Sequence, residues 1–138
     1  MSQITENTLI IKKSDEHNFE KDYDRYEDDY RLNHIQQVFD GRMDDGEEIC
    51  IYVLDCNGDL PWELESDCLC QPIAMETYYF DDNELWTRLK GSDSDYSLKE
   101  YVIKNLTLSD EEMNNLLDKI SYSSDYVASH EVTEIDER

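Results

Sequence analysis

The feature that most constrains the fold of this 138-residue chain is its charge. Asp and Glu number 35 against 12 Lys and Arg, which gives a net charge of −23 at pH 7. Repulsion at this density opposes a compact state, and solubility alone needs a net charge of only about 2–8 for a small domain. Residues 1–69 carry 19 acidic and 6 basic side chains, and residues 70–138 carry 16 and 6. We therefore expect an acidic surface over the whole domain, since an acidic tail would have given unequal halves.

The supply of core side chains is small for a chain of this length. Leu, Ile, Val and Phe together make up 31 of the 138 residues, about 22%, just above the level below which disorder is favoured. Ten Tyr and two Trp favour folding, because each large aromatic ring buries about 150–250 Å². The sequence predicts a single acidic α+β domain over residues 1–125, followed by a flexible C-terminal tail over residues 126–138.

The N-terminal half of the chain alternates strand and helix patterns. Residues 8–12 are β-prone, and Phe19, Tyr23, Tyr26 and Tyr30 recur at helical spacing, which predicts a helix over 15–31 that either ends there or continues to Val38. Residues 41–46 are typical of a turn, and residues 48–54 predict a strand. Asn57-Gly58 then predicts a hairpin turn, with residues 60–64 as a returning edge strand because of Pro61.

The C-terminal half predicts one further strand, over 73–80, and three helices. Asp81 with Glu84 matches a capping box for a helix with Leu85, Trp86 and Leu89 inside and Gly91 at its end. Ser97 is expected to cap a short helix whose apolar positions are Leu98, Tyr101 and Val102. Ser109 with Glu112 caps a third, whose apolar positions are Met113, Leu116, Leu117 and Ile120. The order predicts an α+β fold, a small antiparallel sheet with three to four helices packed on it.

The cysteines and histidines do not form a pattern typical of a metal or catalytic site. Cys50, Cys56 and the Cys68-x-Cys70 pair depart from zinc-site spacing, and the Asp55–Asp59 segment places its glycine wrongly for a calcium loop. His17, His34 and His130 stand far apart and outside any nucleophile motif. We expect reduced thiols, Cys50 packed on a strand and the others in turns, and no cofactor, no metal and no enzymatic activity.

The aromatic stripe of the first predicted helix has two interpretations. Tyr23, Tyr26 and Tyr30 either pack the helix onto the sheet or present an aromatic binding surface, since Tyr is enriched in binding hot spots. The spacing favours the packing interpretation, and the phenolic hydroxyls are compatible with both.

A row of carboxylates on the same helix is the sharpest functional feature. Glu20, Asp24, Glu27 and Asp28 share one face, with Asp22 and Asp29 beside them. Residues four apart on a helix lie about 6 Å apart along its axis, close to the through-space distance between successive phosphates on a DNA strand. Further acidic runs that could extend the row are Asp44, Asp45, Glu47 and Glu48, then Asp81, Asp82 and Glu84, and then Asp93 and Asp95. The alternative is a solvated helix face without a partner.

In size, charge and richness in Asp, Glu and Tyr, the chain resembles the DNA-mimic inhibitors of phages and mobile elements, the anti-restriction and anti-CRISPR proteins. This resemblance implies a non-catalytic inhibitor whose carboxylates pair with the Lys and Arg of a basic nucleic-acid-binding protein, such as a defence nuclease. An alternative is an immunity protein that neutralises a basic nuclease toxin, and a third is a small enzyme that depends on cysteine or metal.

The same charge bounds the partners and the compartment. A net charge of −23 disfavours direct binding to nucleic acid or to an anionic membrane. The sequence shows neither a signal peptide nor an apolar span, so we expect a cytoplasmic protein of a bacterial host cell. Its oligomeric state, monomer or dimer, stays open.

Overall fold

The computed structural model describes residues 4–81, 84–89 and 97–120. Its elements, in chain order, are β1 (Ile4–Lys12), the 3₁₀ turn η1 (Lys13–Asp15), α1 (Glu16–Tyr30), β2 (Asn33–Arg42), β3 (Glu48–Asn57), α2 (Pro61–Leu64), β4 (Ala74–Tyr79), β5 (Glu84–Leu89), α3 (Leu98–Asn105) and α4 (Asp110–Ile120). The predicted α+β class is confirmed. The predicted tail at 126–138 lies outside the described residues, as do Gly91, Asp93 and Asp95.

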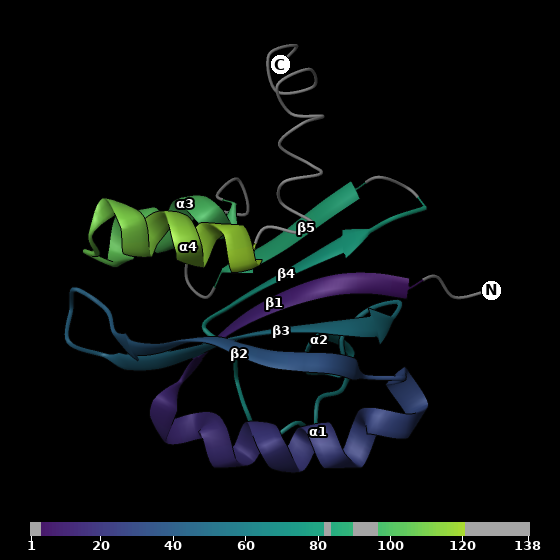
Figure 1. Cartoon of the computed structure of the whole chain (residues 1–138). Coiled ribbons are helices and arrows are strands. Elements are labelled where there is room, and N and C mark those ends of the chain that lie inside the picture. Colours follow the sequence, from purple (N-terminus) through teal and green to yellow (C-terminus); the bar gives the residue numbers. More distant parts are fainter. Residues whose placement is uncertain (1–3, 82–83, 90–96, 121–138) are drawn as a thin grey trace.

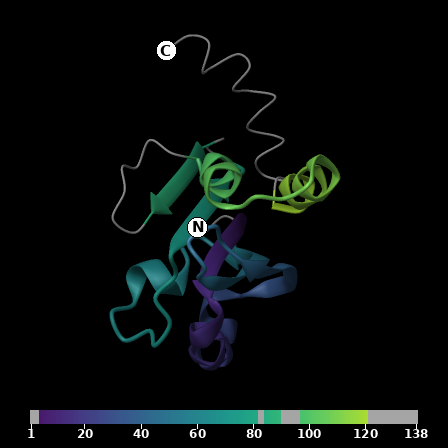
Figure 2. The same ribbon diagram turned by 90° about the vertical axis from the view of Figure 1, so that its left-hand side faces the viewer.

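The centre of the fold is a five-stranded antiparallel sheet with the strand order β2-β3-β1-β4-β5. Helices α3 and α4 cover one face and α1 covers the other (Figure 1). Seen from the side, the segment that carries α2 lies beside α1 (Figure 2). The layers explain why β1 is buried on both sides.

Alternate residues of the central strands supply two separate cores. Leu9 and Ile11 pack toward α1, together with Phe19, Leu54 and Trp62. Ile10 points to the opposite face. That second core lies under α3 and α4 and includes Ile49, Ile51, Leu98, Val102, Leu116 and Ile120. The predicted strands at 8–12, 48–54 and 73–80 and the helices that begin after Ser97 and Ser109 are confirmed.

The first helix ends at Tyr30, so its extension to Val38 is wrong. Arg31 takes up a left-handed conformation (φ 53°), and Leu32 N–H donates to the Glu27 carbonyl at 3.0 Å, which closes the helix end. His34 also has a positive φ of 53°. The chain then turns back as β2, which pairs with β3 along the edge of the sheet.

Two further predictions fail because local patterns were outweighed by the sheet and by proline. Residues 60–64 form no edge strand: β3 continues to Asn57, Gly58 turns with φ 80°, and Pro61 starts the short helix α2 at the position where proline is well tolerated. Residues 84–89 form β5 and no helix, because they pair with β4 in the register Leu85 to Tyr78. The apparent capping box at Asp81 and Glu84 marks a strand connection.

Candidate functional site

Helix α1 is anchored to the sheet by the aromatic stripe. Phe19 is fully buried, with its ring 4.7 Å from the Tyr52 ring and 4.7 Å from the Trp62 ring, centroid to centroid, in stacked geometry. Tyr26 is also buried, and Tyr23 and Tyr30 pack partly buried against the same core. The packing interpretation of the stripe is the one that the structure shows, and most of this aromatic surface is not exposed to a partner.

Phenolic hydroxyls tie α1 to its surroundings on both flanks. Tyr26 donates to Asp67, Tyr30 donates to Glu65 and Tyr52 of β3 donates to Glu16. The hydrogen bond to Asp67 and burial raise the pKa of Tyr26 to about 12. Burial and the bond to Glu16 raise the pKa of Tyr52 further above its ordinary value. These contacts hold α1 in one position, so that its outer face is a fixed surface.

Asp22, predicted to flank the binding row, is instead a buried structural residue. Its side chain is 2% exposed and accepts hydrogen bonds from Trp62 Nε1 at 3.1 Å, Leu69 N–H at 2.9 Å and Cys70 N–H at 2.8 Å. The burial of Asp22 could have been predicted from its spacing, because it falls three residues after Phe19 and four before Tyr26, on the apolar side of the helix. Asp22 therefore holds the 62–70 segment against α1 and is not part of an interface.

The other five predicted carboxylates of α1 are exposed, and no hydrogen bond or ion pair involves them among the residues that the structure describes. They are Glu20, Asp24, Glu27, Asp28 and Asp29. The first four share one side of the helix and are called the α1 stripe from here on. Glu20 and Asp28 stand about 12 Å apart along the axis, at 1.5 Å per residue. Asp29 lies two and a half turns from Glu20 and so points to the opposite flank.

The predicted carboxylates of the 44–48 hairpin form local hydrogen bonds and ion pairs. Asp44 accepts from Thr107 N–H at 2.9 Å and from Thr107 Oγ1 at 3.0 Å. Asp45 accepts from the Glu47 N–H at 2.9 Å. The carboxylates of Glu47 and Glu48 pair with Lys12 at 3.8 Å and with Arg42 at 3.0 Å, respectively.

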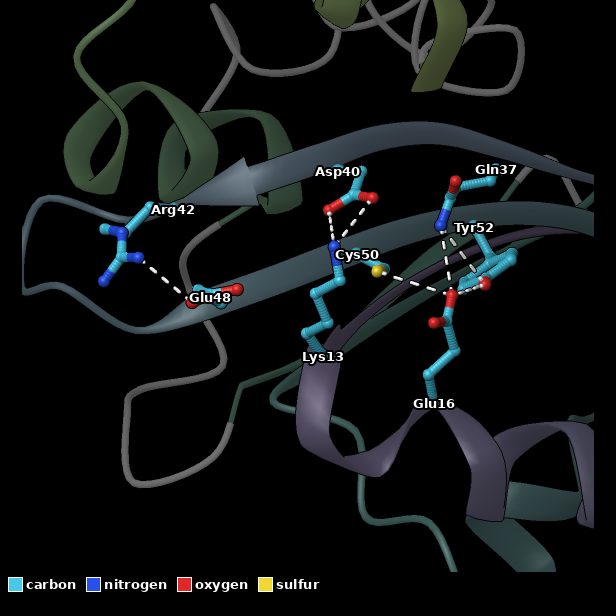
Figure 3. A network of polar contacts seen from close by, with 8 residues as sticks. All are labelled: Lys13, Glu16, Gln37, Asp40, Arg42, Glu48, Cys50 and Tyr52. Atoms are coloured by element: carbon cyan, nitrogen blue, oxygen red, sulfur yellow. Dashed lines mark hydrogen bonds and ion pairs between the residues drawn. The ribbon is translucent and has the colours of Figure 1, made fainter.

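The start of α1 is linked to β2 and β3 by further polar contacts (Figure 3). Lys13 pairs with Asp40 of β2 at 2.8 Å, and Glu16 accepts from Gln37 Nε2 at 3.1 Å as well as from Tyr52. Lys12 and Lys13, just before α1, thus pair with Glu47 and Asp40, and Arg42 pairs with Glu48, so the hairpin carboxylates meet local cations. The predicted continuation of the row into the 44–48 hairpin is therefore not what the structure shows.

The third predicted group lies away from the α1 stripe. Glu84 begins β5, the edge strand at the opposite end of the sheet from β2, and its carboxylate accepts from Trp86 Nε1 at 3.1 Å. Asp81 precedes the same strand, and Asp82 lies outside the described residues. Of the twelve predicted binding residues that the structure describes, the four of the α1 stripe share one exposed helix face without ion pairs.

In the part of the chain that the structure describes, clefts lie at both ends of the α1 stripe. The larger, of about 790 Å³, lies at the C-terminal end of α1 and includes Glu27, Asp28, Arg31 and a pair formed by His34 Nδ1 and Asp55 Oδ2 at 2.8 Å. The smaller, of about 540 Å³, lies between α1 and β2. It is called the α1–β2 groove, and its lining includes Phe19, Glu20, Tyr23, Asp24, Ile35 and Tyr52.

Sequence reasoning did not assign Tyr52 or Ile35 to the α1–β2 groove. Tyr52 lies two residues from both Cys50 and Leu54 in a predicted strand, so the period of two places all three on the same face, toward the helix. Ile35 fell within the wrongly extended helix, and no local pattern places it beside α1.

The four thiols are free and poorly suited to nucleophilic chemistry. Cys50 and Cys56 lie on β3, the latter at its end and not in a turn as expected, whereas Cys68 and Cys70 lie in the loop after α2. Burial, with Glu16 as the next cause, raises the pKa of Cys50 to about 11, and burial raises the pKa of both Cys56 and Cys68 to about 12. All three thiols are therefore protonated at neutral pH, whereas the reactive form is the thiolate. Within the described ranges, no three His, Cys, Asp or Glu side chains are grouped so that they could hold a metal ion.

No helix within residues 4–81, 84–89 and 97–120 has both the length and the apolar character needed to cross a membrane. When the chain was compared with protein-family models, curated proteins and solved structures, none of the three comparisons found a match.

Proposed function

We propose that this protein is a non-catalytic inhibitor that places the α1 stripe in the basic nucleic-acid-binding groove of a partner protein. One observation carries the proposal: Glu20, Asp24, Glu27 and Asp28 are exposed and have no ion-pair partner among the described residues, while the opposite side of their helix is fixed by buried aromatic rings. An array of free carboxylates on a fixed helix presents negative charge in a row along the helix axis.

The chemistry of such an array matches that of a phosphate backbone. Asp24 and Asp28 lie about 6 Å apart along the axis, and the same interval separates Glu20 from Asp24. Lys and Arg side chains that hold successive phosphates could therefore pair with successive carboxylates through charge-assisted hydrogen bonds. The net charge of −23 would add electrostatic steering, so association would be fast and would weaken with salt.

The partner that we propose is a defence nuclease whose DNA groove is blocked by mimicry. A nuclease toxin has the same basic groove, so toxin neutralisation is a separate outcome of the experiment and is decided by which protein is inhibited. Either way the α1 stripe would compete with nucleic acid for the same cations.

The test compares two variants that change the net charge equally. In the stripe variant, Glu20→Gln, Asp24→Asn, Glu27→Gln and Asp28→Asn remove four charges from α1. In the matched control, Asp45→Asn, Glu47→Gln, Glu48→Gln and Glu111→Gln remove four charges from the hairpin and from α4. Thermal unfolding of both variants establishes that each is folded.

The assay measures displacement of a labelled DNA duplex from purified basic nucleases, as a function of salt. The wild-type protein and the control variant should displace the duplex, and the stripe variant should lose roughly a thousandfold in affinity if each lost pair costs about 1 kcal/mol. Equal loss in both variants would mean that only total charge matters, and the proposed surface would be wrong. Displacement by the stripe variant at wild-type strength would also refute it.

A further inference from the structure

The α1–β2 groove combines aromatic surface with unpaired carboxylates. Phe19 forms its base, and Tyr23 and Tyr52 contribute partly exposed rings. Glu20 and Asp24 of the α1 stripe line the same groove from the helix. Aromatic faces and carboxylates both attract cations, and together they favour one that is flat and weakly hydrated.

The hydroxyl of Tyr23 distinguishes this groove from the rest of the aromatic surface. Tyr26, Tyr30 and Tyr52 each donate to a carboxylate, whereas no hydrogen bond involves the Tyr23 hydroxyl among the described residues. Burial, then Glu27 and Asp24, raises the pKa of Tyr23, so the negative potential of the stripe extends to this hydroxyl. The Tyr23 hydroxyl oxygen and the unpaired carboxylates beside it could therefore accept hydrogen bonds from a cationic side chain of a partner.

We infer that the α1–β2 groove receives an arginine side chain of the partner, with the guanidinium between the Glu20 and Asp24 carboxylates and its face against the Tyr23 ring. The inference rests on the proposed function and adds the specific contact through which the α1 stripe recognises a basic protein. Ile35, 38% exposed on the β2 side of the groove, offers an apolar surface for the methylene groups of the arginine.

Charge complementarity selects this occupant over the others that an edge groove could take. A partner strand added to β2 is disfavoured, because the pairing of β2 with β3 is irregular between Asn33 and Gln36 and again between Gln37 and Phe39. An anion would meet Glu20 and Asp24. Lysine would satisfy the carboxylates but lacks the planar face that stacks on a ring.

Lys21 and His17 also line the groove and must be counted against the inference. Lys21 is exposed and forms no ion pair within the described residues, so it competes with an incoming cation for the two carboxylates. Its removal should therefore strengthen binding, whereas removal of the Tyr23 ring should weaken it. Opposite effects from two neighbouring positions are difficult to obtain from nonspecific attraction to an acidic surface.

The experiment titrates the full chain with three blocked amino acids, N-acetyl-arginine amide, N-acetyl-lysine amide and N-acetyl-citrulline amide, and follows the ring resonances of Tyr23 and Tyr52 by NMR. The arginine probe should shift both rings and saturate, with an affinity roughly two- to fivefold above that of the lysine probe, the factor expected from stacking at an exposed site. The citrulline probe, which keeps the shape and lacks the charge, should leave the rings unshifted. Equal shifts by all three probes would overturn the inference.

Two variants and a control complete the test. Tyr23→Leu should reduce arginine affinity by roughly two- to fivefold and remove the preference over lysine, while Lys21→Gln should increase affinity. Tyr101→Leu, on the α3 side of the sheet, is the control and should leave affinity unchanged. Unchanged arginine affinity in folded Tyr23→Leu would overturn the inference.

Failure of the groove contact can be distinguished from failure of the proposed function. If Tyr23→Leu displaces DNA from the partner nuclease as well as wild type does, while the stripe variant does not, the groove contact is wrong and the proposed function stands. If the stripe variant also displaces DNA, the proposed function itself fails.

Discussion

The two faces of the sheet use their acidic residues differently. On the α3 and α4 face, carboxylates complete the fold: Glu76, 2% exposed, accepts from the Leu98 N–H at 3.0 Å, and Asp44 accepts from Thr107. On the α1 face, the buried Asp22 organises a loop, and three further carboxylates accept from tyrosine hydroxyls. The carboxylates of the α1 stripe, in contrast, form no hydrogen bond or ion pair among the described residues. Carboxylates thus stabilise both layers, and the α1 layer carries in addition a row of exposed carboxylates that take no part in its internal bonding.

The cores beneath the two layers differ as well. The core under α1 contains Phe19, Tyr26, Trp62 and the cysteines, whereas the core under α3 and α4 is mainly aliphatic. Large rings with polar tips let α1 be fixed through hydroxyl–carboxylate bonds at its flanks, so its outer face needs no ion pairs for support. The comparison shows that a count of acids does not separate those with a structural role from those without one, and the proposed interface is built on the second group.

The largest expected effect is on the pH dependence of stability, because three tyrosines of the α1 layer contribute to it. The pKa of Tyr26 is raised to about 12, and those of Tyr30 and Tyr52 are raised further, by burial and carboxylate hydrogen bonds. Unfolded tyrosine ionises near pH 10, so above that pH the unfolded state binds fewer protons and the free energy of unfolding falls. The stabilisation is fully present below about pH 10 and is lost as the pH rises through the folded pKa values.

Urea unfolding at a series of alkaline pH values, with tyrosinate absorbance on the folded protein, measures this effect. Tyr52→Phe should make the decline of stability with pH shallower, and Tyr101→Phe should change it less. A free energy of unfolding that stays constant between about pH 9 and pH 12 would contradict the expectation.

The next largest effect should separate Asp22 from Asp24, two positions that belong to the same helix. Asp22→Ala leaves Trp62 Nε1 and the Leu69 and Cys70 N–H groups without their acceptor, so we expect a loss of about 2–4 kcal/mol. Asp24→Ala removes an exposed group without contacts and should change stability by less than about 0.5 kcal/mol. Similar losses at both positions, measured by urea unfolding, would remove the distinction between structural and free carboxylates.

A smaller loss of stability is expected at the N-terminal cap of α4, which includes the carboxylate of Glu112. Ser109 Oγ accepts from the Glu112 N–H at 3.2 Å, and Glu112 Oε1 accepts from Ser109 Oγ at 2.9 Å. Ser109→Ala should cost about 1 kcal/mol. The double variant Ser109→Ala with Glu112→Ala should lose less stability than the two single variants lose in sum. Strict additivity of the two losses would argue against the reciprocal cap.

The smallest effect should be a gain at the end of α1. Arg31 holds a left-handed conformation that glycine adopts without strain, so Arg31→Gly should raise the free energy of unfolding by about 0.5 kcal/mol. Arg31→Lys, with the same backbone cost, is the control and should be neutral. A loss of stability in the glycine variant would indicate that the Arg31 side chain supports the helix end.

Elements with a long apolar period were predictable from the sequence, and those decided by pairing were not. Phe19 to Tyr30 and Met113 to Ile120 repeat at helical spacing, and both helices are present. Residues 84–89 carry a local capping pattern, yet Thr87 Oγ1 donates to buried Glu76 and the segment pairs with β4. Residues 33–42 begin just after Arg31 and contain His34, and no periodicity reveals the left-handed conformation of these two residues.

The same contrast holds for the candidate site. Glu20, Asp24, Glu27 and Asp28 were placed on one helix face by spacing alone, and they share that face in the structure. Asp22 lies at an apolar position of the same helix, where its charge obscured the core period. The hairpin carboxylates were grouped with the α1 stripe because charge counts do not show which acids accept hydrogen bonds from the backbone.

The reactivity of the buried thiols reports local unfolding of this protein. Cys56 and Cys70 are shielded in the α1 core, and burial raises the pKa of each, so alkylating reagents should reach them only when that layer separates from the sheet. Labelling rates at these two positions would therefore report how often α1 and the α2 loop detach, without any added probe. A partner that binds α1 should slow the labelling in proportion to the fraction of the protein that it occupies.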